Sequence, residues 1–332
     1  MGSGAAQQQT DTGLIDAWLL DGRGGGRRLD WNEIATCRPV DGEWLWIHLD
    51  HSQAAVHDWM YTDSGLSAIT ADALLAAETR PRCVPADNGL MIFLRGVNLN
   101  PGADPEDMVS IRMWAGERRV ISLRKRRLLS VDDLRQAIGH GEGPDTPGDF
   151  VVMIVDFLLA RVSGIIDGLY DQVDELEDAV LVSTDYHQRE QLAGIRRQAI
   201  ALRRFLAPQR EALNRLAQER SALLAAGQQL YLRESFDRLT RLVEDLDAAR
   251  ERAAVTQESL VSRFAEQTNQ RMFVLSVVAA IFLPLSFATG LLGVNVGGIP
   301  GADDPKGFAI VVALMLLVGG GLWLFFRWRR WF

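Results

Sequence analysis

Two long apolar segments near the C-terminal end limit the fold of this chain more than any other feature. Met272 to Leu292 is 21 residues without a charged side chain, and Phe308 to Phe326 is 19 residues without one. A bilayer core needs about 20 apolar residues in helical form, so each segment is long enough to cross a membrane once. A buried hairpin of a soluble protein is disfavoured by two runs of this length. The intervening residues 293–307 are rich in glycine and predict a short external loop, so the two spans at 272–292 and 308–326 form a hairpin.

The residues after the second span predict its orientation. Arg327, Arg329 and Arg330 follow the span directly, and Trp328 and Trp331 lie among them. Basic residues favour the cytoplasmic side of a membrane, and tryptophan favours its interface. We therefore expect residues 327–332 to be a basic cytoplasmic tail. The hairpin then places both termini in the cytoplasm of a multi-pass protein of the cell (inner) membrane.

The residues before the spans predict an α/β domain followed by helices. Residues 1–138 alternate strand and helix signals. Residues 139–148 form a linker, 149–227 a helical hairpin, and 228–292 a stalk helix that continues into the first span. The predicted fold class is an α+β membrane protein with an N-terminal cytoplasmic α/β domain, a long helical stalk and two C-terminal transmembrane helices. Strands are expected at Leu14–Leu20, Trp44–Leu49, Leu90–Leu94, Met108–Trp114 and Val120–Leu123, with a turn at 115–117 and helices at Ser67–Ala77 and Ser130–Ile138, each capped by its serine.

Charge patterning in the cytoplasmic helices has two interpretations. Residues 167–178 carry six acidic side chains and no basic one, whereas the next helix, expected to open near Thr184, is rich in arginine. Opposite charges on adjacent helices predict that the two helices pair. The alternative is that the acidic residues concentrate or bind regulatory cations.

The net charge excludes some classes of function. The chain carries −8 overall, and 30 basic against 41 acidic residues precede position 271. An acidic body repels phosphates, so nucleic acid is not an expected partner, whereas cations are. Cys37 and Cys83 have no CxxC spacing and are expected to be reduced thiols. Enzyme signatures such as GxxxxGK[ST], HExxH and GxSxG do not occur, so we expect neither catalytic residues nor a resident cofactor.

One face of the stalk helix carries small and polar side chains at helical spacing. A dry coiled-coil seam would need large apolar residues at these positions. Several copies of the helix with this face inward would line a water-filled pore, which one copy alone cannot enclose. Glu258 would then form an acidic ring at the cytoplasmic mouth. The predicted pore-lining residues are Glu258, Ser262, Asn269, Met272, Leu275, Ser276, Ala279, Leu283, Ser286 and Gly290.

The triplet directly after the first span is the candidate ion-selectivity site. Gly293 lets the backbone leave the helix and expose carbonyls, and Val294 and Asn295 follow it. The amide oxygen of Asn295 is the expected contact to the metal ion. Neutral oxygens at a pore mouth interact with an ion or its hydration water without trapping the ion. The alternative is that Asn295 only caps the helix.

This part of the chain resembles the CorA family of metal-ion transporters. The resemblance rests on Thr268-Asn269-Gln270-Arg271-Met272, on Ile281-Phe282-Leu283-Pro284-Leu285-Ser286-Phe287 and on Gly290-Leu291-Leu292-Gly293-Val294-Asn295. It implies a homopentameric funnel with one central pore, lined by the first span of each subunit. It also implies that the metal approaches the signature in hydrated form.

The signature departs from the family's most common form, Tyr-Gly-Met-Asn. Leu292 and Val294 stand in place of the tyrosine and methionine, and residues 296–301 resemble the ZntB branch, which is associated with zinc. Zinc is therefore the expected transported cation, with magnesium or cobalt as the alternative. A membrane-anchored sensor or scaffold without transport is the other alternative. Oligomeric state separates the two, because a sensor favours a dimer and a pore a pentamer.

Two smaller clusters have weaker functional interpretations. His48, Asp50, His51 and His57 contain zinc-ligand types, but no partner is spaced to complete a tetrahedral site. Trp44, Trp46 and His48 share one face of a strand, so His48 is expected in the core. Asp303 and Asp304 in the external loop either attract cations or form a solvated turn.

Overall fold

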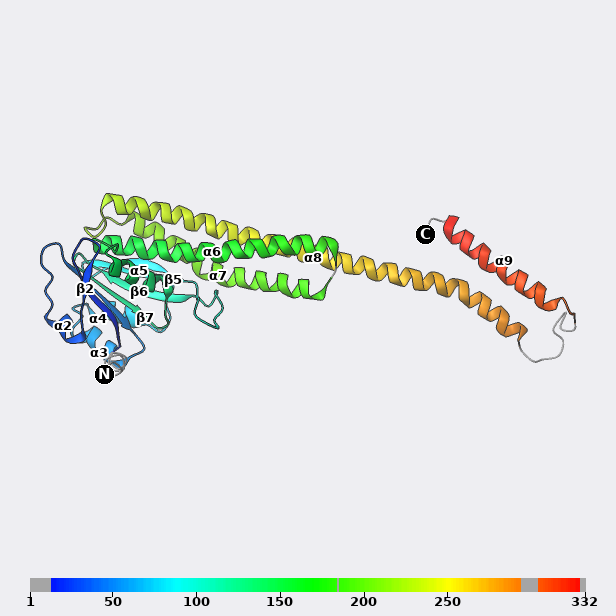
Figure 1. The fold of residues 1–332 in the computed structure, drawn as a ribbon, viewed down its shortest axis with the longest axis horizontal. Helices are drawn as coiled ribbons and strands as arrows, with labels where there is room; N and C mark the ends of the chain where they lie inside the picture. The colour runs from blue at the N-terminus through cyan, green and yellow to red at the C-terminus, as the bar shows by residue number, and fades with distance from the viewer. Residues whose placement is uncertain (1–12, 184, 294–303, 329–332) are drawn as a thin grey trace. The chain divides into compact units, whose positions relative to one another are not determined.

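The computed structural model describes residues 13–183, 185–293 and 304–328. The chain divides into two compact units, Met1–Gln257 and Glu258–Phe332, and helix α8 contributes residues to both. The strands are β1 Leu14–Leu20, β2 Gly26–Arg28, β3 Trp44–Asp50, β4 Arg82–Ala86, β5 Gly89–Gly96, β6 Val109–Ala115 and β7 Arg119–Arg124. The helices are α2 Trp31–Thr36, α3 Ala54–Thr62, α4 Ala68–Leu75, α5 Leu129–His140, α6 Pro147–Val182, α7 Tyr186–Gln218, α8 Ala226–Leu292 and α9 Gly307–Trp328 (Figure 1).

The strands of the first unit form one mixed sheet in the order β2-β1-β3-β7-β6-β5-β4. β3 and β7 are parallel, and the other neighbours are antiparallel. The five predicted strands are confirmed as β1, β3, β5, β6 and β7, and so is the turn between β6 and β7. The edge strands β2 and β4 were not predicted, because the first is three exposed residues long and the second contains a proline.

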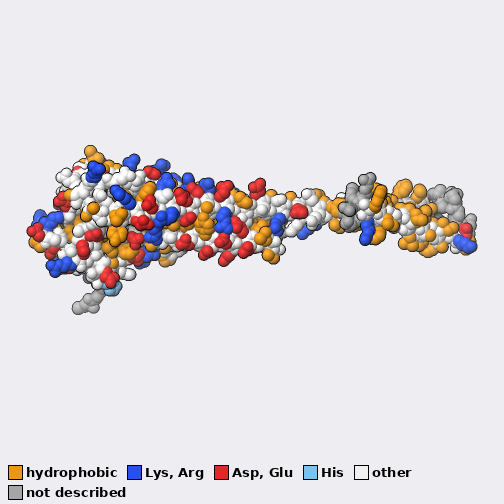
Figure 2. All heavy atoms as spheres, turned by 90° about the horizontal axis from the view of Figure 1, so that it is seen from above, with side chains coloured by type: hydrophobic (Ala, Val, Ile, Leu, Met, Phe, Trp, Pro, Cys, Tyr) orange, Lys and Arg blue, Asp and Glu red, His pale blue; other side chains and the backbone are white. Residues whose placement is uncertain are grey.

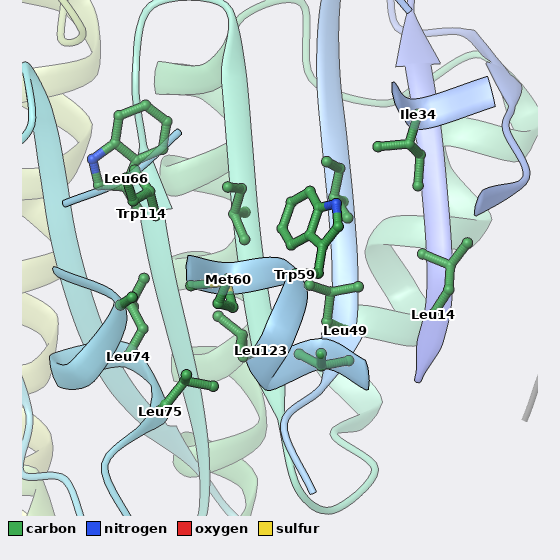
Figure 3. Close-up of a cluster of buried hydrophobic side chains, with 14 of the residues drawn as sticks. Leu14, Ile34, Leu49, Trp59, Met60, Leu66, Leu74, Leu75, Trp114 and Leu123 are labelled. Atoms are coloured by element: carbon green, nitrogen blue, oxygen red, sulfur yellow. The ribbon is translucent and has the colours of Figure 1, made fainter. Parts of the chain in front are cut away.

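Helices α2, α3 and α4 cover one face of the sheet. Trp59 and Met60 of α3 and Leu74 of α4 pack over Leu49 of β3 and Leu123 of β7 (Figure 3). All five side chains are at most 9% exposed. The alternation of apolar residues along the strands therefore provides a core for these helices on this face.

The opposite face of the sheet anchors the long helix α6. The ring of Phe150 lies 6.0 Å from that of Trp44 and 5.2 Å from that of Trp46, measured between ring centroids. Trp46 Nε1 donates a hydrogen bond to Ser122 Oγ at 2.8 Å, and Trp44 Nε1 donates to the carbonyl of Asp145 at 2.9 Å. The buried aromatic strip of β3 thus fixes the first turns of α6.

The connection between α5 and α6 is shorter than the predicted linker. α5 continues to His140 and ends at Gly141, whose φ of 77° is left-handed and suits glycine. α6 begins at Pro147, where Thr146 and Asp149 form a reciprocal capping box. The linker prediction of 139–148 is therefore wrong at both ends, because local capping extends the helices into it.

The predicted serine caps have different outcomes. Ser67 caps α4, since its side chain accepts a hydrogen bond from the Thr70 N–H. The predicted cap at Ser130 is wrong: α5 begins at Leu129, Leu128 occupies the cap position, and Ser130 is buried inside the first turn. Leu128 is 1% exposed, so burial of its side chain sets the start of the helix.

The acidic helix α6 and the basic helix α7 contact each other, as predicted, but acidic residues of α6 and a basic residue of α7 form their ion pairs in the described structure with α8. Arg252 of α8 contacts Asp174 of α6 and lies 2.6 Å from Glu177 of the same helix. Arg203 of α7 lies 2.7 Å from Asp247 of α8. The acidic α6 and the basic α7 thus both find their charge partners on α8. α7 opens at Tyr186 behind an Asp185 cap, whereas Thr184 lies outside the described residues.

Two buried histidines of the first unit make its stability depend on pH. His48 is 0% exposed, and burial, followed by the charges of Arg124 and Arg135, holds its pKa well below the ordinary value. Burial, with Arg112 as the next cause, lowers the pKa of His51 to about 4. The unfolded chain therefore binds protons first as the pH falls below about 6.5, and this destabilises the folded state.

We expect the midpoint of thermal unfolding to fall as the pH drops from about 6.5 towards the lowered pKa values. Replacing His51 by glutamine should make this fall shallower, because one proton-binding site of the unfolded state is removed. Unfolding of the purified protein by circular dichroism from pH 7.5 to 4.5 measures the slope, with His187→Gln on the exposed surface of α7 as the control. Equal slopes for the two variants would contradict the assignment.

Candidate ion-conducting site

The second unit contains two helices that are long and apolar enough to cross a membrane, α9 and the C-terminal part of α8. Their described side chains are mostly hydrophobic, whereas charged side chains are spread over the first unit (Figure 2). The predicted first span is confirmed as a continuous helix to Leu292. The second runs from Gly307 to Trp328, one residue earlier and two later than predicted, so Arg327 and Trp328 are its last residues rather than part of a tail.

One face of α8 in this unit is less exposed than the rest of the helix. Val277 is 4% exposed, and Ile281, Leu285 and Ala288 are half-buried. These residues recur at gaps of four, four and three, which is the spacing of one helix face. A Cβ placed on Gly319 of α9 would lie 3.7 Å from Leu285 Cδ1, an ordinary contact. At Leu285 this face of α8 therefore lies within contact distance of α9.

The predicted pore-lining residues lie on a different face of α8. Ala279, Leu283 and Gly290 each come two residues after a member of the covered face, which is about 200° around a helix. A Cβ added to Gly290 would meet no atom within 4 Å. The whole predicted set is exposed in the single chain: Glu258, Ser262, Asn269, Met272, Leu275, Ser276, Ala279, Leu283, Ser286 and Gly290. The face opposite α9 is thus free to meet water or other subunits.

Within the predicted first span, the polar side chains of this exposed face are the hydroxyls of Ser276 and Ser286. Ser276 donates its hydroxyl proton to the carbonyl of Met272 at 2.8 Å, which leaves the oxygen lone pairs as acceptors. Pro284 lies inside the helix and has no N–H, so it cannot donate to the carbonyl of Ala280. Such oxygens interact with hydrated cations without adding a formal charge to the span.

Gly293 is the one described residue of the predicted selectivity triplet. Its N–H donates to the carbonyl of Thr289 at 2.9 Å, which closes the last turn of α8. Val294 and Asn295 lie outside the described residues, so the role of Asn295 stays a prediction. Asp303 also lies outside them. Asp304 accepts a hydrogen bond from the Lys306 N–H at 2.9 Å, which is a turn at the start of α9.

The alternative metal clusters are not assembled in the described parts of the chain. No group of three or more His, Cys, Asp or Glu side chains is placed to hold a metal ion within residues 13–183, 185–293 and 304–328. His48 lies in the core with Nδ1 2.8 Å from Ser122 Oγ, as the strand pattern predicted. The acidic residues of α6 include two partners of Arg252. The exposed face of α8 therefore remains the candidate site.

Comparison with known proteins identifies the family. A family model described as CorA-like Mg2+ transporter protein matches residues 41–330. The chain belongs to the CorA family. It is 43% identical over 332 residues to the divalent cation transporter CmaX of Pseudomonas aeruginosa, covering 98% of this chain and 99% of CmaX. It is 36% identical over 324 residues to the zinc transport protein ZntB of Yersinia enterocolitica, covering 97% of each chain.

Solved structures of CorA-family proteins show the same architecture. The full-length CmaX structure matches 97% of this chain and 99% of its own with a TM-score of 0.85 and 43% identity. The CorA magnesium transporter from Methanocaldococcus jannaschii matches 94% of this chain and 98% of its own with a TM-score of 0.79. At 19% identity the second match shows the fold alone. The predicted fold of α/β domain, long helix and two C-terminal apolar helices is confirmed.

Glu258 carries the formal negative charge on the exposed face of α8, and it should act through electrostatics. A ring of carboxylates at a pore mouth raises the local cation concentration, and salt screens this effect. We expect Glu258→Gln to lower metal flux more at low than at high ionic strength, with assembly intact. Asp245→Asn, which neutralises an exposed acid about 140° around α8 from Glu258, is the matched control. A flux ratio that does not change with salt would contradict this role.

Proposed function

We propose that this chain transports divalent metal cations, with zinc preferred, through a pore lined by α8. The observation that carries the proposal is the 43% identity to a divalent cation transporter over nearly the whole of both chains. The similarity to ZntB zinc transport proteins, also at full length, supports zinc. The family model, described for Mg2+, keeps magnesium as the alternative cation.

The single subunit supports an oligomeric pore. The predicted pore-lining face of α8 lies on the side away from α9, and one helix cannot enclose a water-filled path. Several copies with this face inward would surround a pathway of hydroxyl, carbonyl and amide oxygens. By resemblance to the family the assembly is a homopentamer. Native mass spectrometry of the purified protein in detergent tests it: five subunits are expected, and a stable dimer would favour the sensor alternative.

In this pore a cation would meet a series of side chains and backbone carbonyls along α8. Glu258 gathers cations at the cytoplasmic mouth, and Ser262, Asn269 and Ser276 hydrogen-bond to the water of hydrated ions. At the other end the carbonyl of Gly293 and the amide of Asn295 select the ion. Moving a bare charge into low dielectric costs several kcal/mol, so the ion keeps most of its water in the span.

The topology proposed for this pore has both termini in the cytoplasm of the inner membrane. Arg327 and Trp328 at the end of α9 support it, because basic residues stay on the cytoplasmic side. A cysteine introduced at the C-terminal end of the chain should resist an impermeant thiol reagent in intact cells, whereas one introduced within residues 294–303 should react. Labelling in the reverse pattern would contradict the orientation.

Metal uptake by proteoliposomes tests the function itself. The purified protein is reconstituted with a metal-sensitive dye inside, and zinc, magnesium and cobalt are compared with and without a pH gradient. Zinc flux above that of empty liposomes is expected, and an effect of the gradient would show proton coupling. Flux of magnesium but not zinc would select the alternative cation, and no flux of any of the three would overturn the proposal.

A further inference from the structure

A cavity rich in basic residues lies in the first unit, between the sheet and α7. Its volume is about 720 Å³, within the range of small-molecule sites in proteins. Seven Lys or Arg residues and three acidic residues line it. The basic residues come from segments far apart in the sequence: the connection before β4, strands β4, β5 and β6, the connection after β7, and α7.

Arg112 of β6 is the buried cation of this cavity. It is 2% exposed, and its guanidinium donates to the carbonyl of Leu74 at 2.8 Å and to that of Ala77 at 3.4 Å. Its Nε is buried and has no hydrogen-bond partner among the described residues. Burial, followed by the charges of Arg95 and Arg82, lowers the pKa of Arg112 to about 10. The protein therefore holds a cation here without the negative charge that would stabilise it.

Arg95 of β5 repeats this pattern beside an aromatic ring. Its guanidinium donates to the carbonyls of Met108 at 2.8 Å and Thr79 at 2.9 Å, while its buried Nε has no partner in the described part of the chain. The guanidinium carbon lies 4.1 Å from the centre of the Phe205 ring. Arg204, also on α7, lies 5.5 Å from the same ring. Arg95 is thus held by backbone carbonyls and by the Phe205 ring, which Arg204 also contacts.

The acidic residues of the cavity do not neutralise its basic residues. Glu78, Glu106 and Asp107 line it, but within residues 13–183, 185–293 and 304–328 none of its seven cations forms an ion pair with a carboxylate. Burial lowers the pKa of Arg95, and the charge of Glu78, which raises it, does not offset this. The cavity therefore keeps an excess of positive charge in an otherwise acidic protein.

We propose that this cavity binds a small phosphate-bearing anion. The volume is far larger than a single halide ion needs, and the cations surround it from several elements. Guanidinium groups offer planar pairs of N–H donors that match phosphate oxygens. Phe205, with the guanidinium groups of Arg95 and Arg204 over its ring, adds an aromatic and cationic surface that a nucleobase could contact. The shared chemistry therefore covers inorganic polyphosphate and nucleotides. Because the cavity lies in the first unit, the proposal does not depend on the transport function.

Titration calorimetry of the full-length protein in detergent tests this site. The buffers are freed of divalent metals with a chelating resin, and ionic strength is held constant with sodium chloride. The probes are inorganic pyrophosphate and ATP. We expect saturable binding of pyrophosphate that chloride does not mimic. Arg82→Gln and Arg204→Gln should each weaken binding about tenfold or more, since a charge-assisted hydrogen bond contributes roughly this factor. Neither side chain forms an ion pair in the described structure, and the contact that each makes with an aromatic ring is to Phe93 for Arg82 and to Phe205 for Arg204. Folding should therefore be retained, and circular dichroism of each variant checks it.

The matched control is Arg233→Gln, which removes the same charge from an exposed position on α8 outside the cavity. Unchanged affinity in this variant, with weakening in the other two, supports the site. ATP binding tighter than pyrophosphate, with the difference lost in Phe205→Leu, identifies a nucleotide, and equal binding identifies an inorganic anion. The proposal is overturned by no saturable binding, or by equal weakening in all three arginine variants. It is also overturned if Arg204→Gln lowers oligomer stability and leaves anion affinity unchanged, because a neighbouring subunit's carboxylate would then fill the cavity.

Discussion

Replacing Asn295 by leucine should reduce metal flux by more than about a hundredfold while the oligomer still assembles. Leucine keeps the approximate size of asparagine but removes the amide oxygen that would interact with the ion at the pore mouth. The interaction of the ion with these oxygens offsets a few kcal/mol of the cost of placing a charge in low dielectric. Each 1.4 kcal/mol that is lost lowers the rate of ion passage about tenfold. Flux in proteoliposomes, normalised to assembled complex, measures this effect.

A second substitution at the same position separates ion selection from helix capping. Glycine is favoured at helix C-termini at least as strongly as asparagine, so Asn295→Gly preserves a capping role and removes the amide. Ion selection predicts that both variants lose flux. Capping predicts that the glycine variant is normal and that the leucine variant is unstable but conducts normally once assembled. Normal flux per assembled complex of Asn295→Leu would end the selectivity hypothesis.

Replacing Gly290 by phenylalanine should reduce metal flux at least tenfold. Gly290 lies on the face of α8 away from α9, and an added side chain meets no atom within 4 Å in the single chain. The variant should therefore fold. In the proposed assembly one phenyl ring from each subunit would meet at the same level of the pore. A hydrophobic constriction of this kind excludes water and ions.

Gly320→Phe is the matched control for this experiment. Gly320 lies in α9, is also exposed, and also has no atom within 4 Å of an added Cβ. Both variants add the same phenyl ring to an apolar helix. Only Gly290→Phe adds it to the predicted pore-lining face, so a difference in flux between the variants reports on the pore. We expect flux per assembled complex to fall at least tenfold for Gly290→Phe and to stay near wild type for Gly320→Phe. Wild-type flux in the Gly290 variant would show that another face of α8 lines the pathway.

The sequence alone determined the features that depend on local patterns. The length of an apolar run is a property of consecutive residues, so the two spans were predicted to within two residues of α9 and of the end of α8. The polar face of α8 followed from helical spacing, and the five longer strands followed from their alternation. The family signature at Gly293 was also visible, because its residues lie next to one another in the chain.

Only the tertiary structure decided which distant residues meet. Arg82, Arg95, Arg112 and Arg204 lie on four different elements, and nothing in their local sequence indicates a shared cavity. The same holds for Arg252, whose charge partners on α6 are more than 70 residues away in the chain. Periodicity reports which side of a helix or strand is apolar, but it does not report what packs against that side. Pairings between distant elements depend on the whole packed core, and so they become visible only once the chain is folded.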